Sequence, residues 1–577
     1  MKSFKNIVVV FTILSVLVGC NDEFMERFPK ASINEANFWN SENELELYVN
    51  ALYPNSNALL GHNTFFGQSQ LLFGDNQSDN LVPLDYNTIL AGEHIVPPSG
   101  GGWNWSFIRS CNYFLNRYDQ TPINLSVKNR FAAEIKLLKA LEYFHMVKRF
   151  GDVPWLSEDL NVNSPELFAP RDSRNLVMDS VLNDLNWAIL NLPEKSNALD
   201  GRLHRDAALA AKARICLHEG TFRKYHNLQG HEKFLQEAYN ASNELIESDN
   251  YQIHATGNPV SDYSTLFNSL DLSSNPEIIM FRRYLVNLLG NMTVQRVTDN
   301  AMNSGGSKSL IETYLADDGL PIDFSPRYLG DQLIEDEMLQ RDPRLTQTFV
   351  YPRTNMQSGF PGPAIPGTDF AASSLSAGIC PTGYQILKYF VDDQEEYLRI
   401  QQGILDAPLF RFGEILLIHA ESAAELDLCD QNTLDKTINI LRQRAGMPNM
   451  VKSEVESWSV NVDYRINYDN INSPLLNEIR RERRVELAVE NFRYDDLMRW
   501  KEGKLLERTV KGMRFNPEIY SNLEIGVDIH LDEDGFILPY AVGLPNGRTF
   551  DENRHYFFPL PIDEMALNSN LNQNPGW

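Results

Sequence analysis

A chain of 577 residues, 43% of them hydrophobic, is long enough to bury one large core or several. Its formal charge of −26 creates a surface that repels phosphate backbones, which excludes nucleic acid as a partner and favours neutral ligands over polyanions. Five widely separated cysteines exclude both a disulfide framework and a CxxC metal site. We therefore predict no cofactor and assign no metal ligands, and the sequence leaves open whether a calcium ion binds at one of the acidic loops.

The N-terminal segment has the pattern of a secretory signal, which we assign to residues 1–19. Lys2 and Lys5 precede an apolar run that is shorter than the roughly 20 residues needed to span a bilayer. The sequence Leu17-Val18-Gly19-Cys20 also has the pattern of a bacterial lipobox, so we expect lipid on Cys20. The alternative is an ordinary signal peptide with an incidental cysteine. The other four cysteines are expected to be small buried residues, with room for one incidental disulfide.

Helical periods dominate the first part of the mature chain, residues 20–255. Apolar residues in Phe131–Phe150 recur at spacings of three and four, and Gly151 and Pro154 end this helix. Further helices are predicted over residues 174–191, where Asp172-Ser173 supplies the cap, and over Arg205–His218 and Glu232–Ser248. Pairs of antiparallel helices joined by short links favour a tetratricopeptide-like scaffold, although no strict 34-residue repeat is visible.

The rest of the chain changes character twice. Residues 256–406 are rich in Gly, Pro, Ser and Asn, which predicts long irregular loops with short helices. In residues 407–577, helices are predicted over Phe410–Leu426, Leu434–Ala445 and Leu476–Trp500, followed by a tail of turns and short strands. No linker separates independent domains, so we predict one mostly α-helical body over residues 20–577.

Three carboxylates on the last predicted helix are the strongest candidates for catalysis. Glu482, Glu486 and Glu490 would share a face about 6 Å apart, close to the ~5 Å of a retaining glycosidase pair. Arginines alternate with them, however, and cationic neighbours lower a carboxyl pKa, whereas a catalytic acid needs a raised one. We interpret these residues as structural ion pairs. Since no metalloprotease, phosphate-loop or nucleophile-elbow motif is present, we predict a protein that is not an enzyme.

An aromatic pair follows a run of three glycines at residues 100–102. In an extended segment Trp103 and Trp105 would point the same way, and two parallel indoles would stack on sugar rings while Asn104 binds hydroxyls. The alternative is that one or both indoles fill the core.

Several blocks of the sequence resemble the SusD/RagB family of glycan-binding outer-membrane lipoproteins. They occur in the family's order, and they cover residues 133–140, 150–154, 341–344, 381–384, 414–421, 442–446, 482–500 and 561–577. The resemblance implies a tetratricopeptide-based fold, an outer-membrane location facing the extracellular side, and a SusC-like TonB-dependent transporter as partner. It implies no catalysis.

The resemblance also suggests which residues contact the ligand. The pattern of Trp103, Phe107 and Asn112 is similar to the region that supplies aromatic sugar platforms in the family. Asp75 and Asp79 occupy positions of polar ligand contacts in related proteins, and the alternative for both is a solvated turn. Tyr284 and Tyr314 are available from the middle loops. Because no Trp lies between Trp187 and Trp458, a strong stacking arc is not expected.

These observations predict a lipoprotein that binds extracellular oligosaccharides and delivers them to the transporter. Two alternatives remain open: a lid of the same kind of transporter that binds peptides, and a surface glycoside hydrolase.

Overall fold

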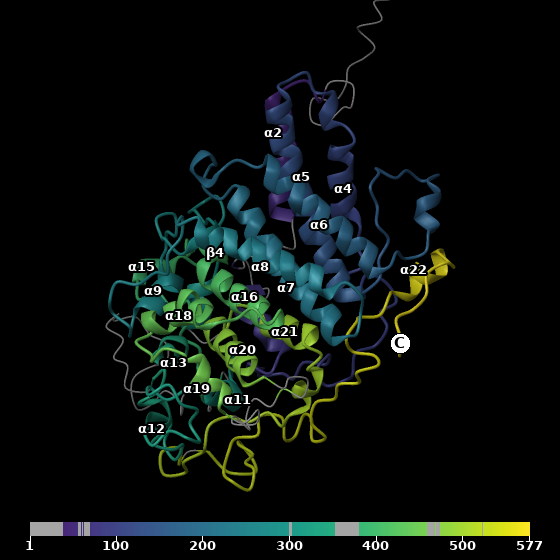
Figure 1. The fold of residues 1–577 in the computed structure, drawn as a ribbon. Coiled ribbons are helices and arrows are strands. Elements are labelled where there is room, and N and C mark those ends of the chain that lie inside the picture. Colours follow the sequence, from purple (N-terminus) through teal and green to yellow (C-terminus); the bar gives the residue numbers. More distant parts are fainter. Residues whose placement is uncertain are drawn as a thin grey trace, which may run out of the picture.

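The computed structural model describes residues 38–55, 59, 62, 70–298, 303–351, 380–458, 468, 473–521 and 523–577. The predicted signal segment and Cys20 lie outside these residues. The first long helices stand together at one end of the molecule, and the helices of the middle and C-terminal parts pack below them (Figure 1). The C-terminal tail runs around the base and up one side to α22 (Ile562–Leu567).

The N-terminal part consists of long helices that pack in sequence order. They are α2 (Glu42–Leu52), α4 (Ser106–Leu115), α5 (Leu125–Phe150), α6 (Arg174–Asn191), α7 (Arg205–Tyr225) and α8 (His231–Glu247). α5 packs on α6, and α7 packs on α8. The predicted caps are present: Gly151 ends α5 with φ 74°, and the Ser173 hydroxyl accepts a hydrogen bond from Leu176 N at 3.4 Å. The helical pairs expected from the sequence are therefore confirmed.

Small residues allow these helices to approach closely. Ala133 and Ala140 on α5 are fully buried, as expected from their shared face. Gly220 lies inside α7, where glycine costs helix stability, because a Cβ there would lie 2.8 Å from the main-chain nitrogen of Leu235 on α8. The core formed in this way continues into α16 (Phe412–Glu425) and α20 (Pro474–Glu486) of the C-terminal part.

The middle part is built from short elements. β1 (Leu81–Pro83) pairs with β3 (Ser304–Gly306), and β2 (Ile278–Arg282) pairs with β4 (Ala407–Arg411), both antiparallel. The short helices here and before β1 are α3 (Gln70–Gly74), α9 (Asp262–Asn268), α10 (Thr293–Thr298), α11 (Lys308–Thr313), α12 (Ile334–Met338), α13 (Arg344–Thr348) and α15 (Gln394–Leu398).

Two predicted C-terminal helices are each divided in the structure. α16 (Phe412–Glu425) agrees with its prediction, but residues 434–445 contain the end of α17 (Gln431–Lys436) and all of α18 (Ile438–Arg444). After α19 (Lys452–Glu456), the predicted helix Leu476–Trp500 is α20 (Pro474–Glu486), a turn, and α21 (Arg493–Arg499). The turn contains Val489 and Asn491, which both have positive φ, so Glu490 does not lie on the helix of Glu482 and Glu486.

The tail after Lys501 contains turns and isolated bridges, such as the bridge between Arg514 and Phe536, where short strands were predicted. It returns to the end of α5, where Phe558 N donates to Arg149 O at 2.7 Å and Asn574 Nδ2 donates to Phe150 O at 3.0 Å. Cys111, Cys216, Cys380 and Cys429 are buried free thiols, which confirms their predicted character.

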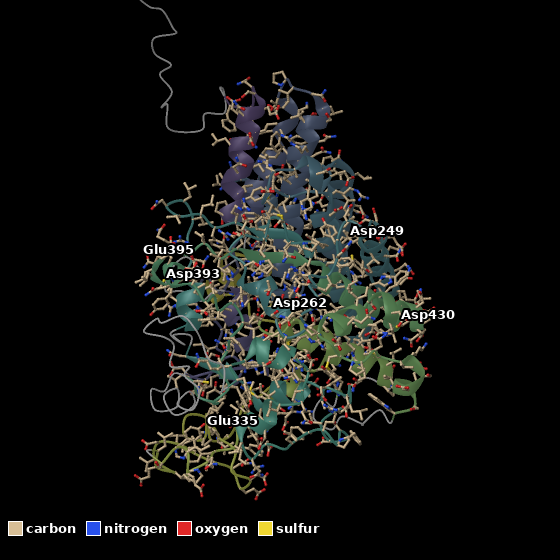
Figure 2. The ribbon with its side chains drawn as sticks, turned by 90° about the vertical axis from the view of Figure 1, so that its left-hand side faces the viewer. Asp249, Asp262, Glu335, Asp393, Glu395 and Asp430 are labelled. Carbon is tan, nitrogen blue, oxygen red and sulfur yellow. The ribbon has the colours of Figure 1, made fainter. Side chains whose placement is uncertain are left out.

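Acidic side chains are spread over the surface. Asp249 and Asp430 lie at one edge of the molecule and Glu395 lies at the opposite edge (Figure 2). All three are exposed. Exposed carboxylates are therefore found on both edges of the part of the chain that the structure describes.

Candidate functional site

The glycine run before α4 turns the chain so that the two tryptophans point in different directions. Gly100, Gly101 and Gly102 all have positive φ, and Asn104 N donates to Gly102 O at 3.0 Å, which closes a turn where an extended segment was predicted. Trp103 is only 7% exposed and packs edge-on against Phe150 of α5. The planes of Trp103 and Trp105 are 83° apart. The prediction of two parallel indoles is wrong, and Trp103 belongs to the core.

Trp105 remains partly exposed; its ring packs edge-to-face on that of Trp103 at 5.1 Å and also approaches a second group of rings. Its ring lies 6.2 Å from that of Tyr143, and Tyr143 in turn lies 4.3 Å from Trp155. Tyr143 is fully buried, whereas Trp155 is partly exposed like Trp105. Lys139 Nζ lies 4.7 Å from the Trp155 ring centroid, and burial lowers the pKa of this amine to about 8. Two partly exposed indoles thus flank a buried tyrosine.

The segment that carries Trp155 is held against α4 by hydrogen bonds. Asn112 Nδ2 donates to the main-chain oxygens of Leu156 and Glu158 at 2.9 and 3.1 Å. The Tyr143 hydroxyl accepts from Leu156 N at 2.7 Å. Asn112 belongs to the pattern that resembles the family. Because its side chain is buried, it holds the Trp155 segment in place.

Polar residues lie near the two indoles in the sequence, on α4 and on the segments that carry Trp105 and Trp155. Asn104 is exposed, and its side-chain oxygen accepts from Ser106 N at 2.9 Å, which leaves its NH2 group directed to other partners. Arg109 is largely exposed and lies 3.6 Å from Asp159. We call Asn104, Trp105, Arg109, Trp155 and Glu158 the α4 face. Aromatic rings next to amide, guanidinium and carboxylate groups suit ligands that combine apolar faces with hydroxyl groups.

Trp155 was not among the predicted contacts, although a sequence signal for it exists. It directly follows Gly151-Asp152-Val153-Pro154, which ends the helix that carries Tyr143. The chain that leaves this helix must return past the start of α4. A tryptophan at the helix exit is therefore a candidate for the same surface as Trp105.

Asp75 and Asp79 do not form a surface contact site, nor do they lie in a solvated turn. Asp75 is buried, accepting from Asn80 Nδ2 at 3.0 Å and from Val489 N at 2.8 Å, and burial raises its pKa. Asp79 accepts from Arg493 Nε at 2.7 Å and lies 3.1 Å from Arg484 Nη2. Both side chains bind residues of the C-terminal part, so their first role is to connect the two parts of the chain.

The middle-loop tyrosines are also buried, which corrects the expectation that they are available to a ligand. Tyr284 is 2% exposed and its hydroxyl donates to His62 O at 2.6 Å, while Tyr314 is 0% exposed. Both rings fill space beneath the irregular surface segments that were expected to present them.

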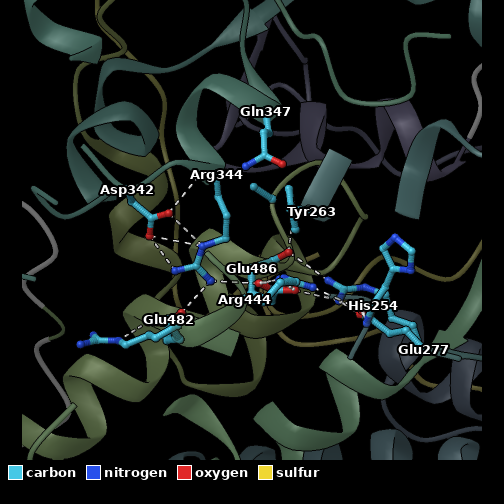
Figure 3. Close-up of polar contacts among 12 residues, drawn as sticks. His254, Tyr263, Glu277, Asp342, Arg344, Gln347, Arg444, Glu482 and Glu486 are labelled. Atoms are coloured by element: carbon cyan, nitrogen blue, oxygen red, sulfur yellow. Dashed lines mark hydrogen bonds and ion pairs between the residues drawn. The ribbon is translucent and has the colours of Figure 1, made fainter. Parts of the chain in front are cut away.

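The three glutamates that were weighed as catalytic candidates are buried and ion-paired, and Figure 3 shows Glu482 and Glu486 among their arginine partners. Glu486 lies 2.9 Å from both Arg344 and Arg411 and 2.5 Å from Arg444. Glu482 pairs with Arg344 and Arg442, and Glu490 pairs with Arg411 and Lys388. Burial alone would raise the Glu486 pKa, but the three guanidinium groups hold it well below its usual range. The structural interpretation is confirmed, although these partners come from other elements rather than from neighbouring turns.

The comparisons with known proteins agree with this architecture. The model of the SusD family, SusD_RagB, matches residues 273–577, which is more than half of the chain. The chain belongs to the SusD family.

Relatives of this SusD-family chain match it over different lengths. SusD-like protein P38 of Formosa agariphila is 23% identical over 86% of this chain and 92% of that protein. SusD-like protein P25 of the same organism is 29% identical, but the match spans only 38% of this chain and 44% of P25. A crystal structure described as a SusD-like carbohydrate-binding protein from Bacteroides fragilis superposes with a TM-score of 0.72 at 23% identity, covering 93% of this chain and all of that one. The mostly α, SusD-like fold class is therefore confirmed.

A hollow in this SusD-family chain is lined by none of the residues of the α4 face. It has a volume of about 560 Å3 and its lining includes Tyr251, Phe412, Asp249 and Asp262. In the described parts of the chain, no group of three or more His, Cys, Asp or Glu side chains is arranged to hold a metal ion. None of the helices within those same ranges combines the length and apolar character needed to cross a bilayer.

Proposed function

We propose that this chain binds extracellular oligosaccharides at the α4 face and delivers them to a SusC-like TonB-dependent transporter. In this proposal a lipid on Cys20 anchors the chain to the outer membrane, on the extracellular side. The observation that carries the proposal is the pair of partly exposed indoles, Trp105 and Trp155, beside the amide of Asn104. Membership of the SusD family and the described carbohydrate binding of a similar structure support it.

The first test is calorimetric titration of the chain without residues 1–20 against plant, microbial and host glycans. We expect saturable binding to one class, because a shallow site that must release its ligand needs specificity with modest affinity. The Trp105→Ala, Trp155→Ala double variant should weaken binding at least about tenfold. Trp187→Ala is the matched control, since Trp187 is also partly buried but lies on α6. Full affinity in the double variant would place the binding surface elsewhere.

The same samples test the two alternatives. A glycoside hydrolase would release reducing ends from the bound glycan, and we expect none because the paired glutamates are fully engaged with arginines. A peptide-binding lid would ignore glycans and bind peptides, for which the 560 Å3 hollow with Asp249 and Asp262 is the candidate site. Peptides therefore belong in the titration panel.

The anchor is tested separately in a host that processes bacterial lipoproteins. Labelled fatty acid should enter the intact protein and should be absent from a Cys20→Ala variant. Equal labelling of both proteins would contradict the assignment of Cys20.

A further inference from the structure

The hollow of about 560 Å3 that contains Tyr251 and Phe412 in its lining has the size of a binding site. Small-molecule sites in proteins have volumes of roughly 300–1,000 Å3. Its lining comes from the end of α8, the segment that follows α8, the start of α16, and the helices α17 and α18. We call it the α8 hollow.

Hydrogen bonds fix the segment that forms one wall of the α8 hollow. Asp249 follows the end of α8 with a left-handed φ of 54°, which turns the chain out of the helix. Gln252 N then donates to Pro276 O at 3.1 Å, and His254 N donates to Glu277 Oε2 at 3.0 Å (Figure 3). The wall is therefore preformed, as is usual for sites that bind small molecules.

The lining is largely apolar. Three isoleucines of the lining are partly exposed and offer aliphatic surface, namely Ile246, Ile253 and Ile440. The rings of Tyr251 and Phe412 are stacked 6.2 Å apart, with 30° between their planes. The Tyr251 hydroxyl already donates to Asp206 Oδ2 at 2.8 Å, so its ring contributes apolar surface rather than a free polar group. Such a lining favours a ligand with an apolar body.

Most of the charged groups in the lining already have partners. Arg444 is buried and lies 2.5 Å from Glu486. The carboxylate of Asp262 accepts hydrogen bonds from three successive main-chain N–H groups at 2.9 to 3.1 Å. Lys436 and Glu247 form an ion pair at 3.1 Å, and their opposite charges offset each other. These groups are therefore compensated without a ligand.

Asp249 is the exception. Its side chain is exposed, lines the hollow, and has no hydrogen-bond or ion-pair partner among the residues that the structure describes. The carboxamides of Gln252 and Gln443 are exposed in the same lining and carry no charge. One uncompensated carboxylate beside apolar walls attracts a cation, since low-dielectric walls strengthen the field of a charge in a cleft. The formal charge of −26 acts in the same direction.

We propose that the α8 hollow binds a small organic cation with an apolar body, such as an aromatic or aliphatic amine. The isoleucines and the two stacked rings contact the apolar body, and the Asp249 carboxylate attracts the ammonium group. A ligand with a carboxylate in place of the ammonium is repelled by Asp249. This site goes beyond the proposed oligosaccharide binding, because it shares no residue with the α4 face.

Three indole derivatives of similar size test the proposal on the chain without residues 1–20. Tryptamine carries an ammonium group, tryptophol a hydroxyl group and indole-3-propionate a carboxylate. Calorimetric titration at neutral pH should show saturable binding, with affinities that fall in this order. Asp249→Asn should weaken the binding of tryptamine about threefold, which is the size expected for an exposed charge pair, and should leave that of tryptophol unchanged.

Two matched controls come from elsewhere in the chain. Asp427→Asn is the control for Asp249→Asn, because Asp427 is also exposed, also follows a helix and also has a left-handed φ, of 59°. Ile440→Gln should weaken the binding of all three probes, since it removes part of the apolar wall. Ile189→Gln, which changes a partly exposed isoleucine on α6, should weaken none of them.

The outcomes separate this site from glycan binding. Equal affinities for the three probes, or an equal effect of Asp249→Asn on all of them, overturn the preference for a cation. Absence of saturable binding to the folded wild type overturns the site itself. Both results leave the proposed glycan binding intact, which Asp249→Asn should not alter. Competition between tryptamine and a bound glycan would show that the hollow belongs to the glycan site and would overturn its independence.

Discussion

The side chain of Asn491 fills the space that a Cβ atom on Gly74 would occupy. Gly74 ends the short helix α3 just before Asp75, and Asn491 lies in the turn between α20 and α21. The glycine therefore allows two segments more than 400 positions apart to meet, and Asp75 completes the contact by accepting from Val489 N.

This contact predicts that a substitution at Asn491 restores the stability lost by a substitution at Gly74. Gly74→Ala should lower the free energy of unfolding by about 1–3 kcal/mol, because overpacking at a tight contact forces the turn to shift. Gly74→Ala combined with Asn491→Gly should recover most of the loss, since Gly tolerates the positive φ of 66° at position 491. Urea denaturation of the wild type, both single variants and the double variant measures this. Purely additive losses would show that the two residues do not interact.

Substitutions of the two tryptophans after the glycine run should have different effects, one on stability and the other on glycan binding. Trp103→Ala should cost about 3–5 kcal/mol of stability, as expected for a large ring removed from a core. Trp105→Ala should cost less and should weaken glycan binding, because its ring is partly exposed. Thermal unfolding and calorimetry on the same preparations provide the comparison. Weaker glycan binding in Trp103→Ala but not in Trp105→Ala, with the larger loss of stability in Trp105→Ala, would contradict the proposal that the α4 face binds glycan.

The glutamate network should depend strongly on Glu486. Glu486→Gln leaves three buried guanidinium groups without their shared carboxylate, so we expect a loss of about 3–5 kcal/mol. Glu247→Gln is the control, because Glu247 and Lys436 form a pair in which the side chains are 57% and 53% exposed, worth under about 1 kcal/mol. Urea unfolding curves at constant pH measure both. Similar losses for the two variants would refute the structural importance of the network.

Buried and partly buried histidines with lowered pKa values should make the fold sensitive to acid. Burial lowers the pKa of His145, His226 and His419 to about 4, from an ordinary value near 6.5. Between pH 6.5 and 4 the unfolded chain therefore binds more protons than the folded chain, so the free energy of unfolding falls as the pH is lowered. The loss is about 3 kcal/mol for a fully buried ring.

His419 provides the cleanest measurement of this effect. Asp406, whose burial raises its pKa to about 6, acts in the opposite direction, since its protonated form is favoured in the folded state below that pH. The slope of stability against pH should therefore be compared between the wild type and His419→Gln, with Asp406 present in both. An unchanged slope in the variant would mean that His419 titrates normally.

Local patterns predicted the long helices, because apolar spacing, the Ser173 cap and the stop at Gly151 all act within a few residues. The break after Glu486 has no such signal, since Leu487-Ala488-Val489 is compatible with a helix. Distant residues hold it: Lys388 Nζ donates to Ala488 O at 2.8 Å and the Tyr389 hydroxyl donates to Val489 O at 3.1 Å. Tertiary contacts outweigh local propensity there.

The candidate site was predicted in part, for a similar reason. Asn104 is exposed and Trp105 partly exposed, and their role as ligand contacts stays a prediction, whereas the direction of Trp103 depended on an extended backbone that three left-handed glycines replace. The partners of Glu486 lie at positions 344, 411 and 444, so spacing along one helix contained no information about them.

The bonds from the tail to the end of α5 affect how the chain is made. Phe150 and Asn574 are separated by 424 positions, so the hydrogen bond between them is among the last to form during synthesis, although Arg171 Nη1 also donates to the same carbonyl at 3.3 Å. The helical pairs rely on neighbours in sequence and form early, whereas closure at α5 waits for the final residues to emerge. A chain that ends a few residues early would therefore have its first helices formed but would lack the hydrogen bond from Asn574 that closes the end of α5.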